Sequence, residues 1–215
     1  RGVVTRLCGA DFSGISETKT GIRVGASVPL ARLLDWMERR GYSGYEFLEG
    51  IPGTIGGALR MNAGAGGDEM GRNVVSVGCV GENGARCLLT RGKKLRFEYR
   101  GCKALEGCII VGAVLRKGKA VSVDEVRRQR AEIREKRMWW KGLRCAGSIF
   151  KNPEGGFAGR LIERCGLKGT KIGGAEILKT HANVIVTGQG ALASDVKCLI
   201  ETIRAEVISQ FGVSL

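Results

Sequence analysis

The side chains best suited to chemistry lie in one ten-residue stretch, Arg144-Cys145-Ala146-Gly147-Ser148-Ile149-Phe150-Lys151-Asn152-Pro153. Ser148 offers a hydroxyl, and Lys151 offers a nearby cation that can stabilise an alkoxide. Ala146 and Gly147 are small, so another molecule can approach the backbone closely. The final proline removes a backbone donor, which ends the run at an edge or a turn. On these residues alone, a proton-transfer site competes with a short strand that ends in a surface turn.

A second stretch, residues 49–72, has the composition of a ligand-cradling loop. Eight glycines alternate with apolar residues such as Ile51, Ile55 and Leu59. Free backbone N–H groups in such a loop can surround an anion. A flexible linker is the alternative, but linkers are rich in polar residues. The stretch matches neither the P-loop pattern nor the dinucleotide fingerprint, so it predicts a different phosphate-binding mode.

The charge balance favours anionic partners. The 215 residues include 35 basic and 21 acidic side chains, which gives a net charge of +14 and suits nucleic acid, phosphates or carboxylates. Basic residues are dense only between positions 127 and 144, and the few aromatic residues do not interleave with them. A single-strand stacking platform is therefore poorly supported, while a basic anion-binding or nucleic-acid-binding protein that uses this run stays an alternative.

The cysteine and histidine content argues against a metal site. The eight cysteines include no C-x-x-C pair, and His181 is the only histidine, so no zinc-ligand spacing is available. We expect buried or partly buried free thiols in a reducing compartment. No apolar run reaches the length of a membrane span, and the start lacks a signal-peptide pattern. These features predict a cytoplasmic location.

The elements that would position these residues form an α+β pattern rather than a strict βαβ alternation. Asn83-Gly84 predicts a hairpin turn, and Ser122 opens a capping box. We expect one domain over residues 1–120 and a second over residues 121–215. The predicted strands cover residues 3–7, 22–26, 74–80, 85–89, 108–115 and 184–187. Helices begin near residues 27, 122, 157 and 194, and Ser194 is the expected cap of the last one. The first helix carries an apolar stripe of Leu30, Leu33, Leu34 and Met37, and most charges of the helix after Ser122 are expected to face solvent. Residues 95–102 are interpreted as extended, with Tyr99 and Arg100 facing opposite ways.

Several separated segments, in order and over nearly the whole chain, together resemble the UDP-N-acetylenolpyruvoylglucosamine reductase (MurB) family. The matching segments are Ile51-Pro52-Gly53-Thr54-Ile55-Gly56-Gly57-Ala58, Asn62-Ala63-Gly64-Ala65, Phe97-Glu98-Tyr99-Arg100, Ala146-Gly147-Ser148-Ile149-Phe150-Lys151-Asn152-Pro153, Ala158-Gly159-Arg160-Leu161-Ile162-Glu163, Cys165-Gly166-Leu167-Lys168-Gly169, Ile172-Gly173-Gly174-Ala175 and His181-Ala182-Asn183. The absence of a long insertion between Leu115 and Ser122 resembles the shorter, type II-like form.

The resemblance implies an FAD-binding domain of the VAO/PCMH type followed by a small α+β MurB C-terminal domain. The family's G-x-G-S-N flavin segment would fall before Arg1, and the family's L-E-x-E-V glutamate would fall after Leu215. We therefore expect a chain truncated at both ends that binds FAD weakly. Other departures are Cys102 in place of the usual serine, Gly66 at a position often aromatic, and Arg137 in place of a common lysine.

The resemblance also implies an activity and the residues that perform it. A monomeric FAD enzyme would use NADPH to reduce UDP-GlcNAc-enolpyruvate to UDP-N-acetylmuramate in peptidoglycan precursor synthesis, with no nucleic-acid, membrane or metal partner. Arg100 would stabilise the substrate carboxylate and Ser148 would donate a proton. The implied cofactor-binding residues are Ile51, Pro52, Gly53, Thr54, Gly56, Gly57, Asn62, Ala63 and Gly64, and the implied substrate-binding residues are Lys151, Asn152 and His181. A different FAD-dependent oxidoreductase and an inactive fragment of the reductase are the alternatives.

Overall fold

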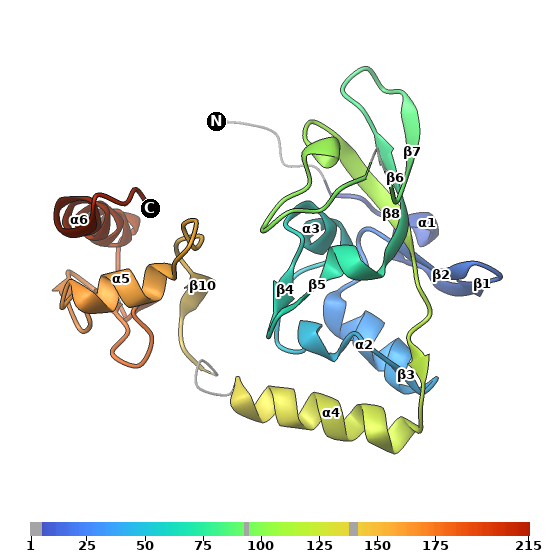
Figure 1. Cartoon of the computed structure of the whole chain (residues 1–215), viewed down its shortest axis with the longest axis horizontal. Coiled ribbons are helices and arrows are strands. Elements are labelled where there is room, and N and C mark those ends of the chain that lie inside the picture. The colour runs from blue at the N-terminus through green and yellow to red at the C-terminus, as the bar shows by residue number, and fades with distance from the viewer. Residues whose placement is uncertain (1–5, 93–94, 138–141) are drawn as a thin grey trace. The chain divides into compact units, whose positions relative to one another are not determined.

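The computed structural model describes residues 6–92, 95–137 and 142–215 (Figure 1). Contacts divide the chain into two compact units, Arg1–Trp139 and Trp140–Leu215, and each is described by itself. The first unit contains α1 (Ala10–Ser13), β1 (Ile15–Thr18), β2 (Gly21–Gly25), α2 (Leu30–Glu38), β3 (Tyr42–Ser43), η1 (Glu46–Leu48), α3 (Ile55–Arg60), β4 (Gly64–Ala65), β5 (Asp68–Glu69), η2 (Met70–Asn73), β6 (Val74–Val80), β7 (Arg86–Thr90), η3 (Lys103–Leu105), β8 (Ile109–Leu115), β9 (Lys119–Ala120) and α4 (Val123–Lys136).

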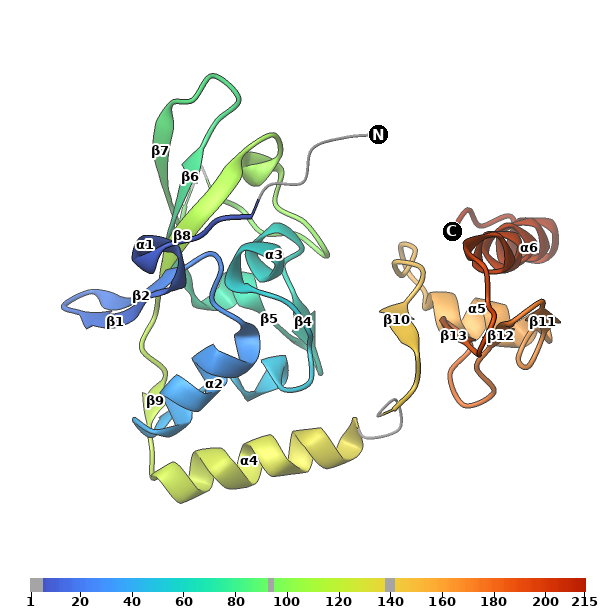
Figure 2. The same ribbon diagram turned by 180° about the vertical axis from the view of Figure 1, so that it is seen from behind.

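An antiparallel sheet with the strand order β1-β2-β8-β6-β7 organises the first unit. The predicted hairpin is confirmed: β6 and β7 pair from Ser76–Thr90 to Val80–Arg86. Gly84 adopts φ 76° at the turn, where the side chain of Asn83 accepts a hydrogen bond from the N–H of Ala85 at 3.0 Å. Figure 2 shows this hairpin extending beyond β8.

Two helices and the sheet enclose the core of this unit. The predicted apolar stripe on α2 is buried through Leu30, Leu33, Leu34 and Met37. The short helix α3 packs on β2 and β8 and buries Leu59 against them. The glycine-rich stretch therefore includes a helix that is fixed to the sheet.

Helix α4 belongs by its contacts to the first unit, which differs from the predicted boundary at residues 120 and 121. Ser122 caps it as predicted, because its hydroxyl accepts the N–H of Glu125 at 3.1 Å. The helix packs on η1, α2 and β3. Arg130, buried on its inner face, pairs with Glu49 at 2.7 Å. The predicted boundary lies where the charged helix begins. In the structure, arginines of that helix form ion pairs with carboxylates earlier in the chain, which belong to the first unit.

The second unit is a small sheet with two helices. Its elements are β10 (Cys145–Ser148), α5 (Ala158–Arg164), β11 (Lys171–Ile172), β12 (Ala175–Ile177), β13 (Val184–Thr187) and α6 (Ala193–Phe211). The strand order is β10-β13-β12-β11, all antiparallel. Ile162, Ile177, Ile185, Leu199 and Ile203 are buried between sheet and helices.

The α+β class is confirmed in both units, with corrections in detail. The strand expected at residues 3–7 falls largely outside the described residues, and residues 6 and 7 are not in a strand. Strands β11 and β12 were not predicted, because two or three residues are too few to show an alternating pattern. Asp195, not Ser194, caps α6 by accepting the N–H of Leu192 at 2.9 Å. All eight cysteines are free, but Cys8, Cys87 and Cys198 are exposed rather than buried.

The described residues contain no helix long and apolar enough to cross a bilayer. They also contain no group of three or more His, Cys, Asp or Glu side chains arranged to hold a metal ion.

Candidate functional site

The glycine-rich loop leaves space beside four of its glycines, Gly53, Gly57, Gly66 and Gly67. Gly53 (φ 119°) and Gly57 are exposed, and a Cβ atom added to either would meet nothing within 4 Å. Pro52 is exposed as well. The carbonyl of Gly53 accepts the N–H of Leu30 at 3.0 Å, so the open segment is fixed to the start of α2. This geometry suits a loop that a ligand can approach closely.

Other predicted cofactor residues in the loop hold its shape. Gly56 donates its N–H to Ala26 at 2.9 Å, and an added Cβ would lie 3.2 Å from the side chain of that residue. The half-buried Ile51 donates its N–H to Leu48 and packs against the core. Thr54 precedes α3 without making a side-chain cap. Gly56 therefore packs closely against Ala26, whereas Gly53 and Gly57 leave room outside.

Asn62, Ala63 and Gly64 lie on the inner side of the loop. Asn62 is fully buried. A Cβ atom added to Gly64 would lie 2.2 Å from the carbonyl oxygen of Asp68. Ala63 donates its N–H to Ala58 and accepts that of Met70, both at 2.8 Å. Because the side chain of Asn62 points into the protein, any ligand contact from these three residues would come from their backbone.

Arg100 sits at the tip of a tight turn rather than on a strand, which corrects the sequence interpretation of residues 95–102. Glu98 and Gly101 exchange backbone hydrogen bonds of 3.0 and 3.2 Å, and Arg100 adopts φ 56° between them. Its guanidinium lies 5.1 Å from the ring centroid of Tyr99, and its Nη2 donates to the carbonyl of Gly64 at 3.0 Å. The turn therefore brings a cation to the end of the glycine-rich loop.

A bulge at the end of β10 presents Ser148. Cys145 pairs with Val186 and Ser148 pairs with Val184, so the β10 side has one additional residue. Gly147 adopts φ 78° within this irregularity, a conformation that glycine tolerates. Ser148 is exposed. The small residue before the serine thus serves the local backbone geometry that directs the hydroxyl outward.

A buried asparagine holds the segment that follows Ser148. The Oδ1 atom of Asn183 accepts the N–H of Phe150 at 2.9 Å, and its Nδ2 donates to the carbonyl of the same residue at 2.9 Å. The carbonyl of Asn183 also accepts the N–H of Ile149 at 2.9 Å. Three hydrogen bonds therefore fix the backbone one and two residues after Ser148.

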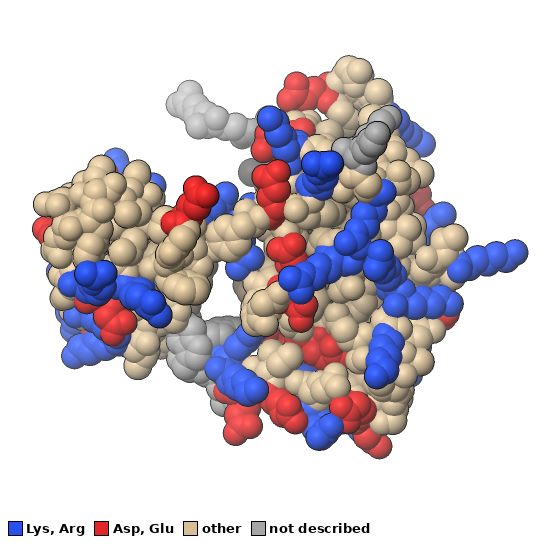
Figure 3. All heavy atoms as spheres, in the orientation of Figure 1, with Lys and Arg blue, Asp and Glu red and all other residues tan. Residues whose placement is uncertain are grey.

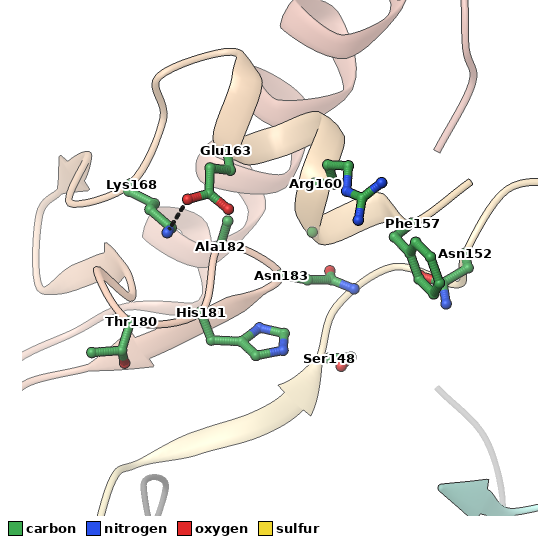
Figure 4. A pocket seen from close by; sticks show the side chains of 11 residues that line it. Ser148, Asn152, Phe157, Arg160, Glu163, Lys168, Thr180, His181, Ala182 and Asn183 are labelled. Atoms are coloured by element: carbon green, nitrogen blue, oxygen red, sulfur yellow. Dashed lines mark hydrogen bonds and ion pairs between the residues drawn. The ribbon is translucent and has the colours of Figure 1, made fainter. Parts of the chain in front are cut away.

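Ser148 lines a hollow of about 500 Å³ in the second unit. Figure 4 shows Ser148, His181 and Asn183 on one side of the hollow and α5 on another. The full lining is Ser148, Asn152, Phe157, Gly159, Arg160, Glu163, Lys168, Thr180, His181, Ala182 and Asn183. The structure thus brings together Ser148, Asn152 and His181, three of the residues to which the resemblance gave roles, while the exposed Lys151 does not line the hollow.

Asn152 also starts the neighbouring helix, because its Oδ1 accepts the N–H of Ala158 at 3.1 Å. Arg160 and Lys168 add positive charge to the lining, and Lys168 pairs with Glu163 at 2.5 Å. The sequence comparison included these segments but assigned no role to their side chains. Their positions on one face of α5 and in the following turn become visible only when the unit folds around the hollow.

The dense basic run does not form a uniformly basic surface. Figure 3 shows Lys and Arg interspersed with Asp and Glu where α4 lies in the first unit. Arg127 pairs with Asp124 at 2.8 Å, Arg128 with Glu125 at 2.6 Å, and Arg134 with Glu49 at 3.0 Å. These ion pairs neutralise much of the run, which weakens the nucleic-acid-binding alternative.

Comparison with protein families matches both units. Residues 3–89 match the family described as FAD binding domain, and residues 140–215 match the family described as UDP-N-acetylenolpyruvoylglucosamine reductase, C-terminal domain. Together with the open glycine-rich loop and the hollow beside Ser148, these matches define an FAD-dependent oxidoreductase.

Individual relatives identify the particular family. A UDP-N-acetylenolpyruvoylglucosamine reductase of Anoxybacillus flavithermus is 39% identical over 218 residues, which cover 100% of this chain and 71% of the relative. One from Nitrosococcus oceani is 41% identical, over 93% of this chain and 67% of the relative. The crystal structure of UDP-N-acetylenolpyruvylglucosamine reductase (MurB) from Thermus caldophilus is 36% identical with a TM-score of 0.80, over 94% of this chain and 73% of that one. The chain belongs to the UDP-N-acetylenolpyruvoylglucosamine reductase family.

Proposed function

We propose that this chain reduces UDP-GlcNAc-enolpyruvate to UDP-N-acetylmuramate with NADPH and FAD, in peptidoglycan precursor synthesis. Family membership supports the reaction class. The single structural observation that carries the proposal is the exposed Ser148 at the rim of a hollow that Asn152 and His181 also line. A hydroxyl, an amide and an imidazole around one hollow suit a polar nucleotide-sugar substrate.

The glycine-rich loop fits FAD. Gly53 and Gly57 leave space that side chains would fill, and the backbone of residues 51–57 is anchored to α2 and to Ala26. We assign the flavin contact to this exposed side, and to backbone groups of residues 62–64 where their side chains face inward or are small. When bound, FAD supplies the hydride exchange between NADPH and the substrate.

Arg100 is the proposed electrostatic stabiliser. Addition of hydride to the β-carbon of the enolpyruvyl group places negative charge on the adjacent carboxylate. A planar guanidinium matches a carboxylate with two parallel hydrogen bonds. Its contact with Gly64 orients the Arg100 side chain before substrate arrives, so little reorganisation is needed as the charge develops.

Ser148 is the proposed proton donor to the α-carbon. An enolate carbon is a strong base, so a hydroxyl can protonate it when a cation stabilises the resulting alkoxide. Lys151 is three residues away and exposed, and we assign that support to it, together with contact to substrate phosphate. Asn152 and His181 are proposed to hold the nucleotide sugar in the hollow.

Transient kinetics of Ser148→Ala tests these roles. Reduction of the bound flavin by NADPH should proceed at the unmodified rate, because Ser148 takes no part in it. Reoxidation by UDP-GlcNAc-enolpyruvate should slow by about 100-fold to 10,000-fold, the usual scale of general acid catalysis. Thr187→Ala, on neighbouring β13, is the matched control because it also removes one hydroxyl. Equal reoxidation rates in the two variants would exclude Ser148 as the donor.

If the alternative of a different flavoenzyme holds, the protein would bind FAD and accept electrons while UDP-GlcNAc-enolpyruvate left the reduced flavin unchanged. A panel of hydroxy acids and sugars would then identify its substrate by their effect on the flavin spectrum.

A further inference from the structure

We propose that Asn62 is a positioning residue for Arg100, and that its side chain acts by joining the glycine-rich loop to the Tyr99-Arg100 turn. The inference rests on the role proposed above for Arg100. It assigns the side chain of Asn62 to the substrate-carboxylate site instead of to FAD.

The hydrogen bonds of Asn62 connect three segments that are separate in sequence. Its Nδ2 donates to the carbonyl of Glu98 at 2.9 Å, and its Oδ1 accepts the N–H of Gly71 at 2.8 Å. Its own backbone N–H donates to Leu59 at the end of α3. The side chain is fully buried, so these protein contacts hold both ends of its amide.

The position requires an asparagine for two reasons. Asn62 adopts φ 41°, in the left-handed region where asparagine is enriched among non-glycine residues. The amide must also donate to one backbone group and accept from another, which aspartate and leucine cannot do. Losing the side chain would leave the N–H of buried Gly71 without its partner, which is costly. It would also remove one of the two hydrogen bonds that the carbonyl of Glu98 accepts, and the bond from the N–H of Gly101 would remain.

The bond to Glu98 holds the base of the turn that carries Arg100. Glu98 and Gly101 close the turn, and Arg100 is strained at φ 56° between them. The guanidinium then donates to Gly64, two residues after Asn62. The loop therefore holds the turn at its base through Asn62 and at its tip through Arg100, which fixes the cation in one place.

Hydrogen exchange on the chain itself, without any cofactor, tests whether the side chain of Asn62 holds the Tyr99-Arg100 turn. Asn62→Gly keeps the backbone conformation available and removes the side chain. We expect the amides of residues 98–101 and of Gly71 to exchange about tenfold faster, the scale of a single lost buried hydrogen bond. Asn62→Asp keeps the acceptor, so exchange should rise at residues 98–101 while Gly71 stays protected.

Tyr45→Phe is the control, because it removes another hydrogen bond of the same unit, from the hydroxyl of Tyr45 to the carbonyl of Arg116. It should leave residues 98–101 protected. Unchanged exchange at residues 98–101 in Asn62→Gly would overturn the inference.

Binding distinguishes positioning from a general structural role. In the FAD-loaded protein, the ratio of affinities for UDP-GlcNAc-enolpyruvate and UDP-GlcNAc reports recognition of the carboxylate. Asn62→Gly should lower this ratio about fivefold, the scale for losing the pre-ordering of one long side chain, with little further loss when combined with Arg100→Met. A fall in FAD affinity with an unchanged ratio would instead assign Asn62 to the cofactor. If the unmodified protein shows no preference for the carboxylate, the role proposed for Arg100 is wrong. The exchange data would still show whether Asn62 holds the Tyr99-Arg100 turn.

Discussion

Arg130 on α4 offers a sharp test of what holds the first unit together. Its side chain is only 6% exposed and its three nitrogens contact three carboxylates: Glu49 at 2.7 Å, Glu38 at 2.7 Å and Asp35 at 3.0 Å. Glu49 is the first residue of the glycine-rich loop. Replacing Arg130 by methionine keeps much of the apolar stem and leaves these carboxylates without their shared cation.

The structure sets the expected magnitude. Removing one partner of a buried ion pair costs about 3–5 kcal/mol. The cost here falls toward the lower end, because Asp35 is 57% exposed and Glu49 keeps Arg134 at 3.0 Å. We expect Arg130→Met to destabilise the first unit by about 3 kcal/mol. Arg127→Met, on the same helix but 61% exposed, should cost less than about 1 kcal/mol.

Urea unfolding followed by hydrogen exchange of individual peptides measures both units in one sample. Peptides from α2 and β6 report the first unit, and peptides from α6 report the second. With a slope of about 2 kcal/mol per molar urea, the first-unit midpoint should fall by about 1.5 M in Arg130→Met. Adding Glu49→Gln should recover part of the loss, because the Glu49 carboxylate is buried and keeps only the exposed Arg134 as an ion-pair partner once Arg130 is replaced. Equal midpoints for Arg130→Met and Arg127→Met would show that the buried ion pairs of Arg130 do not stabilise the first unit.

Two further predictions concern the second unit. Asn183→Ala removes both side-chain hydrogen bonds to Phe150. It should slow substrate-dependent reoxidation of the flavin and leave its reduction by NADPH unchanged, as measured by stopped-flow absorbance. Equal slowing of both steps would contradict a role of Asn183 in placing Ser148. Hydrogen bonds from the N–H groups of Leu192 and Gly174 lower the pKa of Asp195, so its contribution to stability is present above about pH 4 and is lost as the pH falls through the lowered pKa. The midpoint temperature of thermal unfolding of the second unit should therefore fall below about pH 4, and Asp195→Asn should reduce this dependence on pH. The same pH profile in Asp195→Asn and in the unmodified protein would show that Asp195 does not cause it.

The elements that sequence predicted well depend on local signals. The apolar spacing of α2, the Asn83-Gly84 turn and the Ser122 cap all act within a few residues, and the structure contains each of them. Family resemblance located Ser148, Asn152 and His181, which the fold brings to one hollow.

The remaining features depend on partners far along the chain. Arg130 meets Asp35 across 95 positions, and Asn62 meets Glu98 across 36. No spacing rule reveals such pairs, so the charged helix was predicted as solvated and the domain boundary was placed before it. The apolar and aromatic composition of residues 95–102 suggested a strand. Gly101 and the hydrogen bond from the side chain of Asn62 to Glu98 favour a turn instead.

The activity proposed for this chain is reduction of an enolpyruvyl nucleotide sugar through bound FAD. The most direct measurement is the absorbance of its flavin after reduction by NADPH, before and after UDP-GlcNAc-enolpyruvate is added without oxygen. Reoxidation of the flavin with stoichiometric formation of UDP-N-acetylmuramate, identified by mass spectrometry, is the predicted result, and UDP-GlcNAc without the enolpyruvyl group should leave the flavin reduced. A flavin that stays reduced with both compounds would show that the protein does not reduce the enolpyruvyl nucleotide sugar.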